Sequence, residues 1–240
     1  MPSHALTQAR VVVIGGSSGI GQEVARQAVE AGALVTIASR SRDRLDQAVK
    51  AIGGSVEAAV VDVTDEASVS ALFDGIEALD HLVVCPGDMA VGPVAEVTAE
   101  DIRRCLDTKI VGQLLCVRHA VPKLSSTGSV VLMSGAAGFR AYPGLSVTAA
   151  ANAGIGAMGQ SLALELAPLR VNVVVAGVID TPLWSSLPED ARTALFEQTA
   201  RTTPVGRIGR PEDVASAVLQ ALENTFVNGS LIHVNGGGLL

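Results

Sequence analysis

The sequence predicts an α/β protein with a doubly wound, seven-stranded parallel sheet and helices on both faces. Short runs of Val, Ile, Leu and Ala alternate with helical patterns along the whole chain, which indicates successive βαβ units. Hydrophobic residues make up 48% of the chain and aromatic residues only 2%, a composition that suits strands buried on both faces. A glycine-rich turn follows the first apolar run directly. Together these features predict a Rossmann-type fold.

The elements follow one another in a regular order. The predicted strands are the apolar runs 10–14, 34–38, 56–61, 81–85, 129–133, 171–175 and 231–234. The predicted helices are 19–31, 42–51, 66–76, 100–124, 147–167, 188–199 and one that Pro211 opens. Thr98 is the expected N-cap of the fourth helix. We expect one domain over 1–240, with 178–208 as an inserted substrate loop and small helix.

Charge and cysteine usage exclude several classes of protein. The net charge is −7 and no basic patch is evident, so we expect neither nucleic acid nor a membrane surface as a partner. Residues 141–164 carry no charge, but their Pro, Asn, Gln and many Ala residues favour a helix buried in the protein or between subunits. Three cysteines without metal-ligand spacing predict no disulfide framework, no metal and a reduced, cytoplasmic setting. The polar segment 1–10 shows no signal-peptide pattern.

The glycine-rich turn has the form of a phosphate-binding site. It runs Gly15-Gly16-Ser17-Ser18-Gly19-Ile20-Gly21 between the first strand and the first helix. In this arrangement Gly15 permits the tight turn, Gly19 lets the backbone approach a pyrophosphate, and Gly21 lets the helix pack close to the strand. The free N–H groups at the start of the helix favour phosphate oxygens. We therefore predict a dinucleotide site that includes Ser17, Ser18 and Ile20.

The end of the second strand predicts which dinucleotide is bound. NAD-selective sites place an Asp or Glu there to accept from the ribose 2′-hydroxyl. This chain has Ser39 and Arg40 instead, and a guanidinium suits a 2′-phosphate. We favour NADP(H) over NAD(H).

These motifs, with others in the same order, resemble the short-chain dehydrogenase/reductase superfamily over nearly the whole chain. The further matches are Asp62-Val63, the segment 80–87, the helix segment 161–167, Val171-Asn172 through Gly177 to Thr181-Pro182, the segment 211–215 and Val234-Asn235-Gly236-Gly237. The resemblance implies cofactor contacts by Asp62, Val63, Gly87, Gly177, Ile179 and Thr181. It also implies a homo-oligomer, a dimer or tetramer, built on the uncharged helix and the helix that carries Lys109.

The chain departs from that superfamily at its catalytic residues. Members usually carry an Asn, Ser, Tyr, Lys tetrad, and alignment from the flanking motifs places these positions at Lys109, Gly135, Thr148 and Asn152. All four differ, and the single tyrosine, Tyr142, lies six residues before the expected position. Threonine is a poor acid near neutral pH. The usual proton donor is therefore missing, and the Asn and Lys have exchanged places.

We take Lys109, Ser134, Thr148 and Asn152 as the candidate catalytic residues. Lys109 is expected to reach the nicotinamide ribose or the substrate oxygen from the opposite helix, unless it only extends into solvent. Ser134, one residue from the family's serine, either donates to substrate or ends its strand. Thr148 is a helix cap, a pocket wall or a weak acid, and we expect Tyr142 to serve packing.

Three functions remain open at this point. The first is an NADP(H)-dependent oxidoreductase that acts on a carbonyl or alcohol of a small apolar substrate, because the segment 176–196 is rich in Leu and aromatic residues. The second is a cofactor-binding pseudoenzyme that serves as a regulatory or structural subunit of an active homologue. The third is an isomerase or lyase on the same fold, because fold does not fix chemistry.

Overall fold

The computed structural model describes residues 6–240, so the first five residues of the polar N-terminal segment lie outside the described part. Its strands form one parallel sheet in the order β3-β2-β1-β4-β5-β6-β7. They are β1 Arg10–Ile14, β2 Leu34–Ser39, β3 Val56–Val60, β4 Leu79–Val84, β5 Leu124–Gly135, β6 Arg170–Ala176 and β7 Leu231–Val234. The helices are α1 Gly19–Glu30, α2 Arg42–Ile52, α3 Glu66–Asp74, α4 Ala99–Leu106, α5 Gly112–Ala120, α6 Ser146–Glu165, α7 Glu189–Thr202 and α8 Pro211–Glu223. The predicted doubly wound sheet is confirmed.

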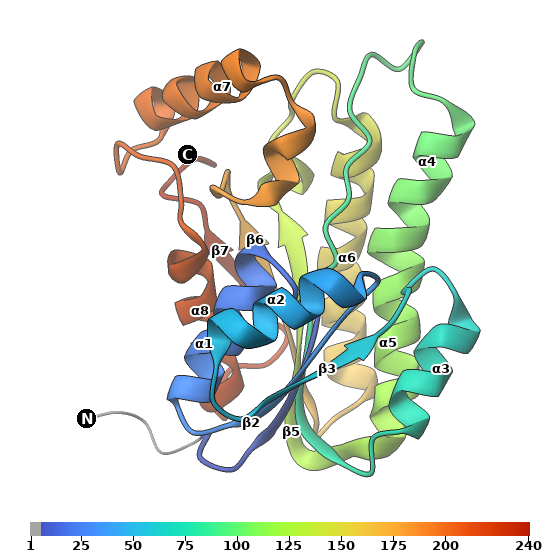
Figure 1. The fold of residues 1–240 in the computed structure, drawn as a ribbon. Coiled ribbons are helices and arrows are strands. Elements are labelled where there is room, and N and C mark those ends of the chain that lie inside the picture. Colours follow the sequence, from blue (N-terminus) through green and yellow to red (C-terminus); the bar gives the residue numbers. More distant parts are fainter. Residues whose placement is uncertain (1–5) are drawn as a thin grey trace.

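Helices cover both faces of the sheet (Figure 1). One core cluster joins the strands to α3, α5 and α6 through residues such as Phe73, Val117 and Ile155. The other joins them to α1, α2 and α8 through residues such as Val24, Leu45 and Val218. Because both faces are buried, the central strands are apolar at nearly every position, and all seven residues of β6 are buried.

The site lies where the order of the strands reverses. β1 pairs with β2 on one side and with β4 on the other, so the chain winds in opposite directions from this point. In such sheets, ligands bind in the crevice outside the carboxyl ends of the strands. Figure 1 shows α7 at the same end of the molecule as the arrowhead of β5.

The predicted helix 100–124 is wrong as a single element. Thr98 caps α4 as predicted, accepting from Asp101 N at 3.1 Å. The helix then widens into a π-helical turn, Asp107–Val111, before α5, and ends in a 3-10 turn, Val121–Lys123. A π turn inserts a residue without changing the hydrophobic pattern visibly, so periodicity does not reveal it. Such turns are frequent at functional sites, and this one carries Lys109.

Strand β5 is longer than the predicted run 129–133. Its first residue, Leu124, pairs with Leu79, and the register shifts before His81 pairs with Ser129. The polar residues between these two pairs hide the extension from the sequence pattern. Within residues 6–240, no helix combines the length and apolar character needed to span a membrane. The same residues contain no group of three or more His, Cys, Asp or Glu side chains arranged to hold a metal ion.

Candidate active site

The glycine turn packs so closely against its neighbours that side chains are excluded. Gly15 has φ +82°, and a Cβ there would lie 2.5 Å from the carbonyl oxygen of Cys85. A Cβ at Gly21 would lie 2.3 Å from the carbonyl oxygen of Gly15. The glycine turn therefore packs directly against the start of α1 on one side. On the other side it packs against Cys85, the residue that follows β4. We refer to this backbone-lined turn, residues 15–21, as the cradle.

The start of α1 is open to an anion. Its N-cap, Ser18, makes no side-chain capping bond, and the first turn contains no acidic residue. The first N–H groups of a helix lack intrahelical partners and carry partial positive charge. Ser17 and Ile20 flank this end and are half-buried. The cradle and the bare helix end together fit a pyrophosphate, so the residues present suit a dinucleotide.

The loop after β6 closes one side of this cradle. A Cβ at Gly19, whose φ is +55°, would lie 3.2 Å from Thr181 Cβ. A hydrogen bond within the loop fixes its shape, because Trp184 Nε1 donates to the carbonyl of the buried residue Ile179 at 2.8 Å. At the root of the loop, Gly177 N donates to the Val234 carbonyl at 2.9 Å. Residues far apart in sequence therefore lie side by side here.

The end of β2 and the loop after β3 form the other side. Ser39 Oγ is buried and has no hydrogen-bond partner among the described residues, while Arg40 next to it is exposed. Asp62 accepts from Thr64 N at 3.0 Å and from Thr64 Oγ1 at 2.7 Å. Burial raises the pKa of Asp62, but these bonds and the charge of Arg40 outweigh it and lower the pKa overall. Val63 is buried beside them.

Gly87 follows β4 and faces the loop after β6. A Cβ there would lie 3.4 Å from Leu183 Cδ1, so the loop after β6 reaches over the loop after β4. Leu183 belongs to a 3-10 turn, Pro182–Ser186, that precedes α7. Trp184 in this turn packs edge-on against Phe196 of α7, with ring centroids 6.4 Å apart. The segment 178–208 thus places apolar side chains beside the site.

Lys109 is buried in the π-helical turn, with 8% of its surface exposed. Burial lowers its pKa, and the Cys105 thiol and the Asp88 carboxylate act weakly in the opposite direction. No carboxylate of the described residues lies within salt-bridge distance of it; Asp88 is paired with Arg104. The sequence alternative in which Lys109 extends into solvent does not agree with this burial.

Asn152 and Gly135 fit one another. A Cβ at Gly135 would lie 2.9 Å from Asn152 Nδ2, so the Asn152 amide fills the space beside Gly135. Asn152 Oδ1 is buried and has no partner within the described part of the chain. Ser134 Oγ donates to the Asn152 carbonyl at 2.8 Å. A buried amide oxygen without a donor is costly, which marks it as a candidate acceptor for a ligand hydroxyl.

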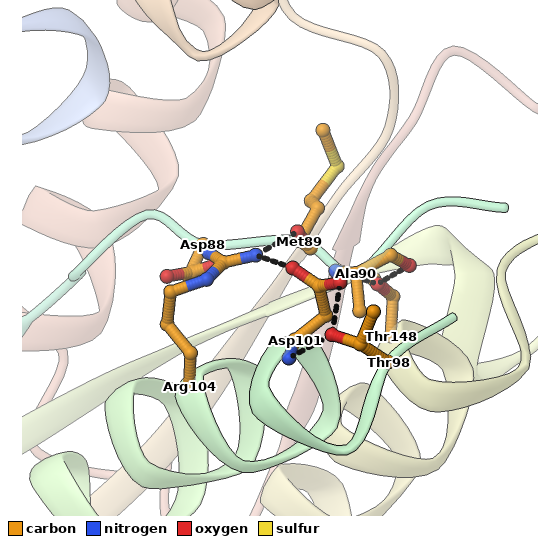
Figure 2. A network of polar contacts seen from close by, with 7 residues as sticks. All are labelled: Asp88, Met89, Ala90, Thr98, Asp101, Arg104 and Thr148. Carbon is orange, nitrogen blue, oxygen red and sulfur yellow. Dashed lines mark hydrogen bonds and ion pairs between the residues drawn. The ribbon is translucent and has the colours of Figure 1, made fainter. Parts of the chain in front are cut away.

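Thr148 is tied to the loop after β4. Its hydroxyl accepts from Ala90 N at 3.0 Å and donates to the Ala90 carbonyl at 2.9 Å (Figure 2). The residue lies inside α6, whose N-cap is Leu145, so it ties α6 to the loop after β4 and is not the helix cap. Both hydrogen-bonding functions of the hydroxyl are used by the backbone.

Sequence reasoning missed two polar side chains that make long-range contacts, one fully buried and one nearly buried. Gln113 of α5 is fully buried and brackets Met133 of β5, donating to its carbonyl at 3.0 Å and accepting from its N–H at 3.3 Å. Asp88 pairs with Arg104 across the loop after β4. Asp88 follows Gly87 directly, but its partner lies 16 residues away, and the sequence pattern does not connect them.

Comparison with known proteins agrees with this geometry. The family model described as enoyl-(acyl carrier protein) reductase matches residues 14–238. The chain is 35% identical to the cis-4-hydroxycyclohexanecarboxylate dehydrogenase of Sinomonas cyclohexanicum, with 98% of both chains covered.

Two solved structures are similar over their whole length. MalC reductase/Diels-Alderase of Malbranchea aurantiaca has a TM-score of 0.92 at 28% identity, covering 100% of this chain and 99% of that one. The NADPH-bound short-chain oxidoreductase of Pseudomonas aeruginosa PAO1, described as containing an atypical catalytic center, has a TM-score of 0.88 at 30% identity, covering 97% of each. The chain belongs to the short-chain dehydrogenase/reductase superfamily.

Proposed function

We propose that this protein is an NADP(H)-dependent oxidoreductase that interconverts a carbonyl and an alcohol on a small apolar substrate, with Lys109 in place of the usual tyrosine. The observation that carries the proposal is Lys109 itself. It is buried, its pKa is lowered by that burial, and no carboxylate of the described residues is paired with it. A lysine whose pKa is lowered by burial gives up its proton more readily than an exposed lysine does.

The cofactor would be held by the residues that surround the cradle. Gly15, Gly19, Gly21 and the open end of α1 would take the pyrophosphate, with Ser17, Ser18 and Ile20 around it. When bound, NADP(H) supplies or accepts the hydride. The unpartnered Ser39 Oγ and the exposed Arg40 suit a 2′-phosphate. The similar Pseudomonas oxidoreductase was solved with NADPH, which supports the same choice here.

The chain's own residues would divide the remaining work. Lys109 would give its proton to the substrate oxygen in reduction and take it back in oxidation. Asn152 Oδ1 would accept from a hydroxyl of the cofactor ribose or of the substrate, since it lacks a partner. Ser134 would hold the backbone of Asn152, because its hydroxyl donates to the Asn152 carbonyl. Thr148 would hold the loop after β4, because its hydroxyl donates to the Ala90 carbonyl. The Trp184–Phe196 pair would exclude water.

Calorimetric titration with NADPH and with NADH is the first test. We expect NADPH to bind at least tenfold more tightly, which corresponds to about 1.4 kcal/mol. Turnover would then be measured with cis-4-hydroxycyclohexanecarboxylate and NADP⁺, and with a panel of cyclic ketones and NADPH. Lys109→Met should lower the turnover rate by roughly 10²- to 10⁴-fold, while Lys123→Met should leave it unchanged. Full activity of Lys109→Met would refute the assigned role.

The pseudoenzyme remains a second candidate function. It is favoured by Thr148 and Ser134, whose hydroxyls are occupied by backbone partners. Failure of both nucleotides to bind would leave the cradle as a structural relic and support this function. NADPH binding without turnover of any substrate, together with co-purification of an active homologue, would support it equally.

A non-redox activity is the third candidate. A similar structure is that of a protein named both reductase and Diels-Alderase, so the fold also serves chemistry without net hydride transfer. Conversion of a substrate with no change in NADPH absorbance would identify such an activity.

We also propose a homo-oligomer, a dimer or tetramer, in a reduced cytoplasmic setting. Ile102, Val111 and Leu114 are exposed apolar residues along the α4–α5 segment, which supports a covered face there. Cys85, Cys105 and Cys116 are all free thiols. Light scattering coupled to gel filtration gives the oligomeric state directly, and a monomer at micromolar concentration would contradict this proposal.

A further inference from the structure

Arg104 of α4 binds two carboxylates and one backbone carbonyl, and so connects α4 to the loop after β4. Its guanidinium contacts Asp88 Oδ1 with Nη1, and Nη2 donates to Asp101 Oδ1 at 3.2 Å and to the Met89 carbonyl at 3.4 Å. Figure 2 shows Arg104 reaching from α4 to both carboxylates. The Asp88 side chain is only 9% exposed, so Arg104 neutralises a carboxylate that water barely reaches.

The same carboxylate is the acid that acts on Lys109. The ionisable groups that influence Lys109 are the Cys105 thiol, one turn earlier on α4, and Asp88. From α6, which packs against the π-helical turn, residues 146–164 contribute no ionisable side chain, and none is present in β5. On α5, Arg118 and His119 are engaged with Glu66 of α3.

Of the acids on α4 and in the π-helical turn itself, Asp101 contacts Arg104 and Asp107 is exposed. The loop that carries Asp88 packs against the turn, because Ala90 lies in one cluster with Cys105 and Ile110 on either side of Lys109. Asp88 is thus the nearly buried carboxylate beside Lys109, and Arg104 already pairs with it.

We propose that Arg104 is a positioning residue that keeps the Asp88 carboxylate from pairing with Lys109 and so leaves Lys109 free to exchange its proton with substrate. The inference rests on the proposed role of Lys109 as proton donor and acceptor. Without Arg104, Asp88 would be a nearly buried carboxylate with no countercharge, which is strongly unfavourable. A pair with the Lys109 ammonium would supply the missing countercharge, and such a pair holds the lysine in its charged form.

The direct test is the titration of Lys109 in the whole protein. The sequence contains only Lys50, Lys109 and Lys123, so ¹³Cε-lysine labelling gives a spectrum simple enough to follow each side chain against pH. Lys109→Met assigns the Lys109 signal, and the other lysines serve as internal references. In Arg104→Gln we expect the Lys109 midpoint to move to higher pH by about one unit or more.

Matched variants separate this effect from loss of structure. Arg103→Gln removes the same charge from the neighbouring exposed position and should not move the Lys109 midpoint. Arg104→Lys retains a cation for Asp88 and should restore the midpoint toward that of the wild type. In an Asp88→Asn background, Arg104→Gln should no longer raise the midpoint, because the competing carboxylate is gone.

The pH dependence of turnover provides the second reading. Reduction requires charged Lys109 and oxidation requires neutral Lys109, so Arg104→Gln should move the lysine limb of both profiles to higher pH. An unchanged Lys109 midpoint in folded Arg104→Gln would overturn the inference while leaving the role of Lys109 intact. Full activity of Lys109→Met would overturn the role of Lys109, and the titration would still report whether Arg104 controls the charge of Lys109.

Discussion

Asn152 Nδ2 lies 2.9 Å from the point that a Cβ at Gly135 would occupy. Real Cβ atoms essentially never approach a heavy atom so closely, so these two positions are coupled. A serine at position 135, which the sequence alignment predicts to be the serine position of the superfamily, is incompatible with the observed Asn152 rotamer. The glycine at position 135 therefore accommodates the Asn152 side chain.

This coupling predicts a non-additive pair of substitutions. Gly135→Ala should destabilise the protein by about 1–3 kcal/mol, because the new methyl group must displace a buried amide. Asn152→Ala should abolish most of that penalty in the double variant. Urea unfolding of the four proteins measures the coupling. Gly75→Ala is the control, since its Cβ would meet nothing closer than 3.5 Å; additive free energies in the cycle would show that the two positions are independent.

The regular parts of the fold could be predicted from the sequence because they depend on local patterns. β1, the glycine turn and α1 follow from an apolar run, closely spaced glycines and a helical period, and β6 follows from its unbroken apolar run. The π-helical turn was missed because it keeps the same helical pattern. The links Asp88–Arg104, Thr148–Ala90 and Gln113–Met133 were missed because each joins residues 16 to 58 positions apart. Such contacts depend on how the elements pack.

The close approach of Gly19 to Thr181 predicts a specific loss of cofactor binding. Gly19→Ala introduces a Cβ at φ +55° that would lie 3.2 Å from Thr181 Cβ, at the place proposed for the phosphates of the cofactor. Gly206→Ala introduces a Cβ at φ +73° with nothing within 4 Å. Both should lose about 1–2 kcal/mol of stability through backbone strain. Calorimetry should show weaker NADPH binding for Gly19→Ala alone; equal affinity in both variants would contradict the assigned cradle.

Arg40 predicts the choice between the two dinucleotides. Arg40→Asp replaces a cation suited to a 2′-phosphate with an acid that repels it. NADPH affinity should fall by tenfold or more, about 1.4 kcal/mol, while NADH affinity should be unchanged or higher. Arg44→Asp makes the same charge change at an exposed position of α2. If the two variants lose NADPH affinity equally, the effect is general electrostatics and Arg40 does not read the phosphate.

His81 predicts how stability depends on pH. It lies on β4, bonded through Nδ1 to Ser129 Oγ at 2.9 Å; burial lowers its pKa to about 4, and the nearby Arg170 adds to this while Asp80 opposes it. Its pKa is therefore depressed on folding from an ordinary value near 6.5, so the unfolded chain binds the proton more readily. The contribution of neutral His81 to the free energy of unfolding is therefore fully present above about pH 6.5 and is lost as the pH falls towards 4.

Between pH 7 and pH 5, the titration of His81 alone should lower the free energy of unfolding by about 2 kcal/mol. His81→Asn keeps a hydrogen-bonding atom near the Nδ1 position without a proton to gain, so its stability should fall less over this range than that of the wild type. His233→Asn, at an exposed position of β7, should keep the slope of the wild type. Urea unfolding at both pH values measures the difference, and equal slopes for His81→Asn and the wild type would show that His81 does not control the acid sensitivity of the fold.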